Sequence, residues 1–249
     1  MTTPEELPPR LAELARNSGA QLAQAVRDYG KVVYSTSLGP ESAVMTDLIC
    51  TFAPDIDMFT IDTGRLPDET LALLDRVERR YERRIKVYYP DSAAVEAYVQ
   101  ANGINGFYSG LEERQSCCHV RKVEPFKRAV VGYKAWITGV RREQSAERAK
   151  GEVLAWDDRH DMWKVSPLLD WTEEDIWDFI RVRNLPYNPL HDKGYPSIGC
   201  APCTRAVEPG ADPRSGRWWW ENPETRECGL QPRRRVIPIK PEPRRAAGA

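Results

Sequence analysis

The sequence has no long hydrophobic run, and this absence excludes a membrane-spanning helix. No apolar stretch approaches the roughly 20 residues that a bilayer requires. The N-terminal stretch MTTPEELPPRLAEL also lacks the basic-then-apolar order of a signal peptide. With 41% hydrophobic and 29% charged residues, the chain has the composition of a soluble globular protein. We therefore expect a cytoplasmic protein with no membrane partner.

Two common nucleotide-binding fingerprints are missing as well. The chain contains neither GxGxxG nor GxxxxGK followed by Ser or Thr, which excludes the ordinary dinucleotide and mononucleotide loops. Structural disulfides are rare in the cytoplasm, where thiols are kept reduced. The six cysteines of the chain therefore require another explanation, which is metal binding, catalysis or simple burial.

The C-terminal tail differs in composition from the rest of the chain. Residues 232–249 hold six Lys/Arg, one Glu and four Pro, so their formal charge is +5 and that of residues 1–231 is −6. Prolines oppose a packed element, which predicts an extended, disordered tail. A basic tail can contact nucleic acid, but a solvated end is the simpler explanation, and we expect no nucleic-acid partner. Residues 1–231 then form a single domain.

The order of the predicted elements indicates an α/β fold. The predicted strands are 31–36, 57–61, 85–89, 135–140 and 162–166. The predicted helices are 5–17, 20–29, 41–52, 68–83, 92–102, 111–131 and 172–183, the last with Thr172 as its N-cap. This alternation predicts a central, mostly parallel sheet flanked by helices.

Three polar turns follow strands of this sheet, at residues 35–42, 62–70 and 138–145. Ligands of such sheets bind at the carboxyl ends of the strands, so we expect the turns to lie together. The first turn, STSLGPES, opens a helix whose free amides can bind an oxyanion, and a glycine allows close backbone approach. Its candidate substrate-binding residues are Ser35, Ser37, Gly39 and Ser42. A plain serine-capped connection would look the same, and the turn alone does not decide between the two.

The third turn, TGVRREQS, is rich in arginine. Its candidate substrate-binding residues are Gly139, Arg141 and Arg142. Guanidinium groups bind phosphate and sulfate in a bidentate manner. Glu143 and Glu147 nearly neutralise this stretch, so a solvated charged loop is the better interpretation when the turn is taken by itself.

Four of the cysteines form two close pairs, Cys117-Cys118 and Cys200-x-x-Cys203. Four thiolates satisfy either a tetrahedral Zn²⁺ or an iron–sulfur cluster. Neighbouring side chains on a helix diverge by about 100°, so an adjacent pair suits a larger multi-iron cluster better than one small ion. Basic residues that follow the first pair would offset the negative charge. This chemistry favours [4Fe–4S] over zinc and leaves open that the thiols are merely buried.

Together these motifs resemble a known enzyme family. The chain reads SxSLGxES, CCxxRK, TGxRRxxS, a CxxC and a terminal ECGL, in an order that covers residues 31–231. This combination is similar to the assimilatory adenylyl-sulfate (APS) reductases, within the phosphoadenylyl-sulfate reductase family. The resemblance implies an adenine-nucleotide alpha-hydrolase-like fold of the PP-loop type. It also implies a [4Fe–4S] cluster on Cys117, Cys118, Cys200 and Cys203, a set that similar enzymes for the 3′-phosphorylated substrate PAPS generally lack.

The resemblance gives the remaining thiol of the C-terminal region a role as well. It implies that Cys228 attacks the sulfur of APS, that AMP departs, and that thioredoxin or a glutaredoxin-like dithiol then releases sulfite. The matching positions of Lys122, Arg214 and Arg217 lie around the phosphosulfate. We expect the ECGL segment to be mobile and to deliver the nucleophile.

One residue departs from the family pattern. The family motif reads ECGLH, and Gln231 stands in place of the histidine. Glutamine can bind substrate by hydrogen bonds but cannot titrate, so we expect activity to survive at a reduced level. A homo-oligomer is also expected.

Three other functions stay open at this point: a PAPS reductase of the same mechanism, an ATP-dependent adenylyl or thiolation enzyme on the same fold, and a non-catalytic iron–sulfur ligand sensor. Two further features are interpreted as structural. Cys50 lies off the apolar stripe of its helix, and residues 218–220, three tryptophans, are expected to pack the cluster lobe more than to stack on adenine.

Overall fold

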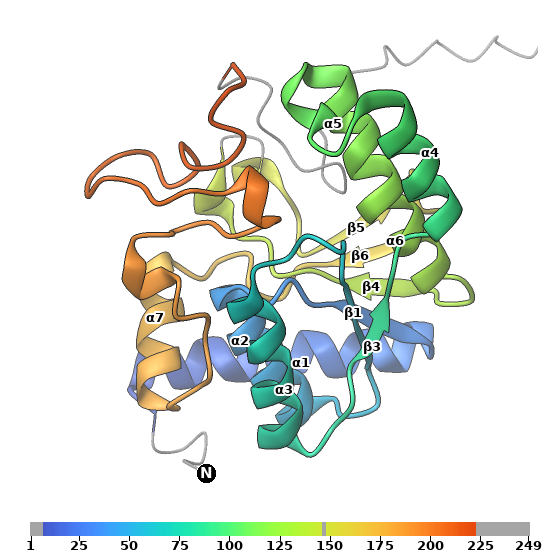
Figure 1. The fold of residues 1–249 in the computed structure, drawn as a ribbon. Helices are drawn as coiled ribbons and strands as arrows, with labels where there is room; N and C mark the ends of the chain where they lie inside the picture. The colour runs from blue at the N-terminus through green and yellow to red at the C-terminus, as the bar shows by residue number, and fades with distance from the viewer. Residues whose placement is uncertain (1–6, 146–147, 223–249) are drawn as a thin grey trace, which may run out of the picture.

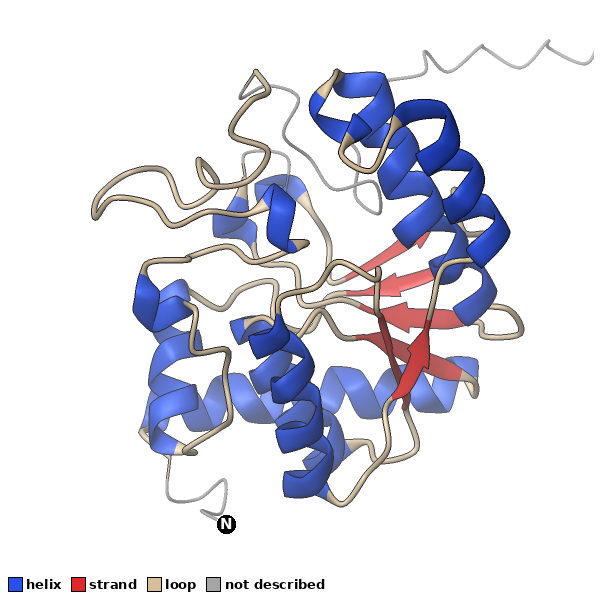
Figure 2. Cartoon of the chain, in the orientation of Figure 1, coloured by secondary structure: helices blue, strands red, loops and turns tan. Residues whose placement is uncertain are grey.

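A six-stranded sheet forms the centre of the molecule in the computed structural model, which describes residues 7–145 and 148–222. Its strands are β1 (Val32–Ser35), β2 (Asp57–Ile61), β3 (Lys86–Tyr88), β4 (Ala135–Ile137), β5 (Leu154–Asp157) and β6 (Met162–Val165). The strand order is β3-β2-β1-β4-β6-β5, with β5 antiparallel to β6 and the other pairs parallel (Figure 2). The prediction of a mostly parallel α/β sheet is confirmed.

Helices cover both faces of this sheet. They are α1 (Pro9–Tyr29), α2 (Pro40–Phe52), α3 (Asp68–Tyr81), α4 (Ser92–Asn102), α5 (Leu111–Cys118), α6 (Glu124–Ala129) and α7 (Glu173–Val182). Figure 1 shows α1, α2, α3 and α7 on one side of the sheet and α4, α5 and α6 on the other. None of the helices in the described residues is both long and apolar enough to cross a bilayer.

Alternation along β1 divides the apolar core between the two faces. Val32 and Tyr34 belong to the larger cluster of buried residues, which includes those of α1, α2 and α7. Val33 belongs to the second cluster, with Phe126 of α6 and Trp136 of β4. Successive side chains of a strand point to opposite faces, so the continuous apolar run of β1 is what a strand buried on both sides requires.

The N-terminal region differs from its prediction. Helices were expected at 5–17 and 20–29, but α1 is one continuous helix. The glycine between them, Gly19, lies where α1 crosses α2: a Cβ there would be 2.5 Å from the Phe52 ring. The glycine therefore permits close helix packing and does not end the helix.

Two further differences concern element boundaries. The antiparallel edge strand β5 was not predicted, because its exposed Leu154 and Trp156 alternate with half-buried residues and do not form an apolar run. The predicted helix 111–131 is helical through residue 129, although a π-helical turn, His119–Val123, joins α5 to α6. The other predicted strands and helices are present, several of them one to three residues shorter, and Thr172 caps α7 by accepting a hydrogen bond from the Asp175 amide at 3.0 Å.

Candidate active site

The first turn leaves β1 at Ser35 and enters α2 at Pro40, at the carboxyl end of the strands. Its serine side chains bond within the turn: the Ser37 amide donates to Ser42 Oγ at 3.1 Å, and the two hydroxyl oxygens lie 3.2 Å apart. The left-handed backbone conformation falls on Leu38, with φ 58°, while Gly39 has an ordinary φ of −84°. The turn is therefore a preformed loop at the start of a helix, as an oxyanion site requires.

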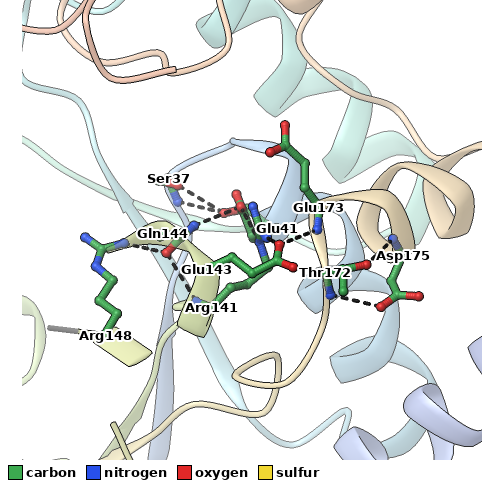
Figure 3. Close-up of polar contacts among 10 residues, drawn as sticks. Ser37, Glu41, Arg141, Glu143, Gln144, Arg148, Thr172, Glu173 and Asp175 are labelled. Carbon is green, nitrogen blue, oxygen red and sulfur yellow. Dashed lines mark hydrogen bonds and ion pairs between the residues drawn. The ribbon is translucent and has the colours of Figure 1, made fainter. Parts of the chain in front are cut away.

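The third turn lies against the first, as predicted. Arg141 Nε donates to Glu41 Oε1 at 3.0 Å, and Gln144 Nε2 donates to the same oxygen at 2.9 Å (Figure 3). Gly139 makes this contact possible, because a Cβ on it would be 3.1 Å from Glu41 Cβ. Sequence reasoning missed Glu41 and Gln144, whose partners lie about a hundred positions away along the chain.

Arg141 is buried and held between two carboxylates. Its side chain is only 6% exposed, and Nη1 donates to Glu143 Oε2 at 2.9 Å, opposite its bond to Glu41. Glu143 in turn accepts the Glu173 amide at 3.0 Å and so connects the turn to the start of α7 (Figure 3). We call Glu41, Arg141, Glu143 and Gln144 the sheet-edge network. In this network the arginine charge is balanced by carboxylates, so its main contribution is to fix the shape of the turn.

Arg142, predicted beside Arg141, bonds elsewhere. Its Nε donates to Asp170 Oδ1 at 2.6 Å, and Nη1 donates to the carbonyls of Ala149 and Gly151. These contacts fasten the loop that follows the turn. Arg141 is extended, whereas Arg142 begins the short helical turn Arg142–Gln144, so their side chains point in different directions.

The four paired cysteines come together, although 82 positions separate the second from the third. Cys117 and Cys118 end α5, while Cys200 caps and Cys203 ends a short helical turn, Ala201–Cys203. All four line one pocket, which we call the cysteine pocket. Five cationic side chains also line it: Arg65, Arg114, Arg121, Lys122 and Arg217.

The second turn, after β2, holds the cysteine loop in place. Thr63 Oγ1 lies 3.2 Å from Cys200 Sγ, and the Ala201 amide donates to the Arg65 carbonyl at 2.8 Å. Arg121 Nη1 donates to the Thr63 carbonyl at 2.7 Å, which joins the π-helical turn to the same point. The turn predicted to bind a ligand thus also positions one wall of the cysteine pocket.

Burial and the neighbouring thiols raise the pKa of two of the pocket cysteines. Burial, with the neighbouring Cys200 and Cys118, raises the pKa of Cys203 to about 12, and burial raises the pKa of Cys117. In the described residues, no three His, Cys, Asp or Glu side chains are arranged to hold a single ion. Metal ligation deprotonates thiols outright, and a multi-iron centre takes four of them from a larger perimeter than one ion does. The cysteine pocket therefore fits such a centre in donor type, number and surrounding positive charge.

Similarity to known proteins shows the family of this chain. Residues 31–206 match the model of the phosphoadenosine phosphosulfate reductase domain. The chain belongs to this family. It is 52% identical over 220 residues to the adenosine 5′-phosphosulfate reductase of Allochromatium vinosum, covering 88% of this chain and 86% of that protein. It is 46% identical over 248 residues to the enzyme of the same name from Burkholderia cepacia, covering 99% and 98%.

Solved structures agree with the family assignment. The phosphoadenylyl-sulfate reductase of Candida auris, in a phosphate complex, superimposes with a TM-score of 0.66 at 25% identity, over 81% of this chain and 98% of that one. The FMN adenylyltransferase of Candida glabrata with ATP gives a TM-score of 0.55 at 16% identity, over 88% and 74%. The second likeness shows the fold alone, which is the PP-loop type expected from the resemblance.

In this phosphoadenosine phosphosulfate reductase domain, two of the three basic residues predicted around the phosphosulfate, Lys122 and Arg217, line the cysteine pocket. Arg217 is pressed against Gly199, where a Cβ would be 2.2 Å from Nη2, and its guanidinium lies 4.5 Å from the Trp218 ring. Arg214 lies in the turn that ends at Arg217, whose amide donates to the Arg214 carbonyl at 2.9 Å.

Trp218 packs in the interior of this reductase, as predicted. It is 2% exposed and clusters with Cys117, Cys203 and Phe107. Cys228 and Gln231, with the ECGL segment and the basic tail, lie outside the described residues. Their roles stay predictions.

Proposed function

We propose that this chain reduces adenylyl sulfate (APS) to sulfite and AMP in the cytoplasm, as a step of sulfate assimilation. Support comes from relatives named adenosine 5′-phosphosulfate reductase across nearly the whole chain. The structural observation that carries the proposal is the cysteine pocket, where two distant cysteine pairs meet beside Lys122 and Arg217.

The first chemical step is sulfo transfer to Cys228. The thiolate attacks the sulfur of APS, an S–S bond forms, and the bond from sulfur to the bridging phosphate oxygen breaks as AMP leaves. Only a small fraction of an ordinary thiol is ionised at neutral pH, so cations near the reacting sulfur are needed. Lys122, Arg214 and Arg217 would bind the phosphosulfate and stabilise the thiolate.

The second step releases sulfite. A thiolate of thioredoxin, or of a glutaredoxin-like protein, attacks Cys228 Sγ and displaces sulfite, and the second thiol of the donor then resolves the mixed disulfide. The dithiol is oxidised to a disulfide and supplies both electrons. No further reductant is required.

The cysteines Cys117, Cys118, Cys200 and Cys203 would hold a [4Fe–4S] cluster. When bound, this group would tie α5 to the loop through Cys200 and add its charge beside Lys122. The chain's own residues contribute the rest: the sheet-edge network shapes the turn after β1 for the adenylate phosphate, and Thr63 and Arg121 hold the pocket wall. We propose a homo-oligomer as well, on the family resemblance alone.

Initial rates with the purified protein test this function. Sulfite release should require APS and a reduced thioredoxin, and Cys228→Ser should lower the rate by about 10³-fold or more while APS still binds. Cys50→Ser, a change at a half-buried thiol on α2, should leave the rate within twofold.

Other outcomes would select the alternatives. Faster turnover of PAPS than of APS would make the chain a PAPS reductase, which the four-cysteine set disfavours. Consumption of ATP would indicate the adenylyl-transfer chemistry of its structural neighbours. APS binding without sulfite release by the wild type would indicate a non-catalytic ligand sensor.

A further inference from the structure

A buried ion pair joins the cysteine pocket to the end of the described chain. Arg114 of α5 donates from Nε to Glu221 Oε1 at 2.7 Å and from Nη2 to Glu221 Oε2 at 2.8 Å. The two side chains are only 2% and 5% exposed, although 107 positions separate them. A parallel two-bond pair of this kind fixes both the distance and the orientation of its partners.

Arg114 is also part of the pocket wall. It lies one helical turn before Cys117, its guanidinium is 4.8 Å from the Trp218 ring, and it interacts with Cys118. Removing one partner of a buried pair leaves an uncompensated buried charge, which is strongly unfavourable. Glu221 is therefore held firmly to the helix that carries two of the pocket cysteines.

We propose that the Arg114–Glu221 pair is a positioning element that fixes the starting point of the segment carrying Cys228. Cys228 lies seven residues beyond Glu221. At about 3.3–3.6 Å per residue, the pair keeps the thiol within roughly 25 Å of the point where the carboxylate is bound. The expected effect on sulfonation rate rests on the proposed function, whereas the effect on the position of Cys228 does not.

The pair acts on direction more than on distance. Without it, the nearest packed residue before Glu221 is Trp220, whose ring centroid lies 4.5 Å from that of Tyr108. The number of residues from the last fixed point to Cys228 then grows only from seven to eight. Loss of direction at Glu221 therefore carries the effect, and we expect sulfo transfer to slow by about two- to tenfold.

Glu221→Gln is the informative variant, because it keeps the shape of the side chain and removes its charge. In single-turnover experiments its rate of Cys228 sulfonation should fall two- to tenfold, while the APS Kd and the cluster absorbance stay within twofold of wild type. The matched control is Asp47→Asn, which breaks a second buried pair, Asp47 with Arg183, on the far side of the sheet from the pocket. The control should leave the sulfonation rate unchanged.

A second measurement does not depend on activity. In a Cys50→Ala, Val131→Cys variant, which changes an exposed valine, spin labels on Cys228 and at position 131 report the distance between them by pulsed electron resonance. The distance distribution should broaden in Glu221→Gln and not in Asp47→Asn. An unchanged distribution would overturn the proposal even if the protein proved to have another function. Equal losses of sulfonation, APS binding and cluster absorbance would show a purely structural pair. If the wild type forms no adduct but the distribution broadens, the proposed function fails and the positioning role stands.

Discussion

Positive charge is balanced differently in the sheet-edge network and in the cysteine pocket. In the network, Arg141 is enclosed by Glu41 and Glu143, so the turn after β1 is neutralised by its own side chains. The pocket gathers five cations and four thiols, and Glu221 pairs with one of those cations, Arg114. The first region is a shaped frame. In the second, under the proposed function, the positive charge would be balanced by thiolates on a metal centre and by the phosphosulfate of the substrate.

The largest effect should come from removing a thiol of the pocket. We expect Cys203→Ser to lose the iron content and visible absorbance of the purified protein, because serine is a poor ligand for a cluster that needs four thiolates. Iron analysis and spectroscopy measure this directly, and Cys50→Ser is the control. Wild-type iron content in Cys203→Ser would show that the pocket does not hold the cluster.

The next effect tests the cations of the pocket. In Gly199→Ala the new methyl would meet the Arg217 guanidinium at 2.2 Å, so the arginine must move away. We expect kcat/KM for APS to fall by about 10- to 100-fold, which corresponds to roughly 1.4–2.8 kcal/mol. Gly132→Ala is the control, because nothing lies within 4 Å of a Cβ there and its cost is backbone strain alone. Equal kcat/KM values for the two variants would show that Arg217 does not contribute to APS turnover.

A smaller effect should follow in the neutral region. Glu41→Gln removes the carboxylate that Arg141 and Gln144 share. We expect the free energy of unfolding to fall by about 1–3 kcal/mol, because a buried arginine loses a charged partner. Asp75→Asn, which breaks an exposed pair on α3, should change it by less than about 0.5 kcal/mol. Urea unfolding gives both values. Similar values would show that the sheet-edge network does not stabilise the fold more than an exposed ion pair does.

The smallest effect is a pH dependence beside the network. The Arg10 guanidinium and the amide and hydroxyl of Thr172 lower the pKa of Asp175 from 3.8 to about 2. A lowered pKa gives stability that is present above the unfolded value and is lost as the pH falls from about 5 to about 2. The difference in unfolding free energy between wild type and Asp175→Asn should therefore shrink over that range. A difference that stays constant down to pH 3 would contradict the assignment.

Local patterns predicted most of the sheet and its helices. The stripe from Val44 to Phe52 marked α2, and Thr172 marked the start of α7, because periodicity and capping are properties of a few neighbouring residues. The break predicted between residues 17 and 20 is absent from α1, and Gly19, which lies there, packs against Phe52. A glycine that packs against another helix cannot be told from one that ends a helix until the partner helix is known.

The candidate site was predictable only where residue type carries the chemistry. The paired cysteines stood out because their spacing is itself the signal. Glu41 and Glu221 did not, because a glutamate in the first turn of a helix or near a chain end is ordinary, and their partners Arg141 and Arg114 lie about a hundred positions away. Such long-range pairs exist only in the folded chain.

The central claim is that APS transfers its sulfo group to this protein, and intact-protein mass spectrometry tests it most directly. The protein is mixed with APS in the absence of any reductant and then digested to locate the modification. The account predicts a gain of one SO₃ group on Cys228, which reduced thioredoxin removes with release of sulfite. An unmodified Cys228, in protein that retains its iron and binds APS, would contradict the account.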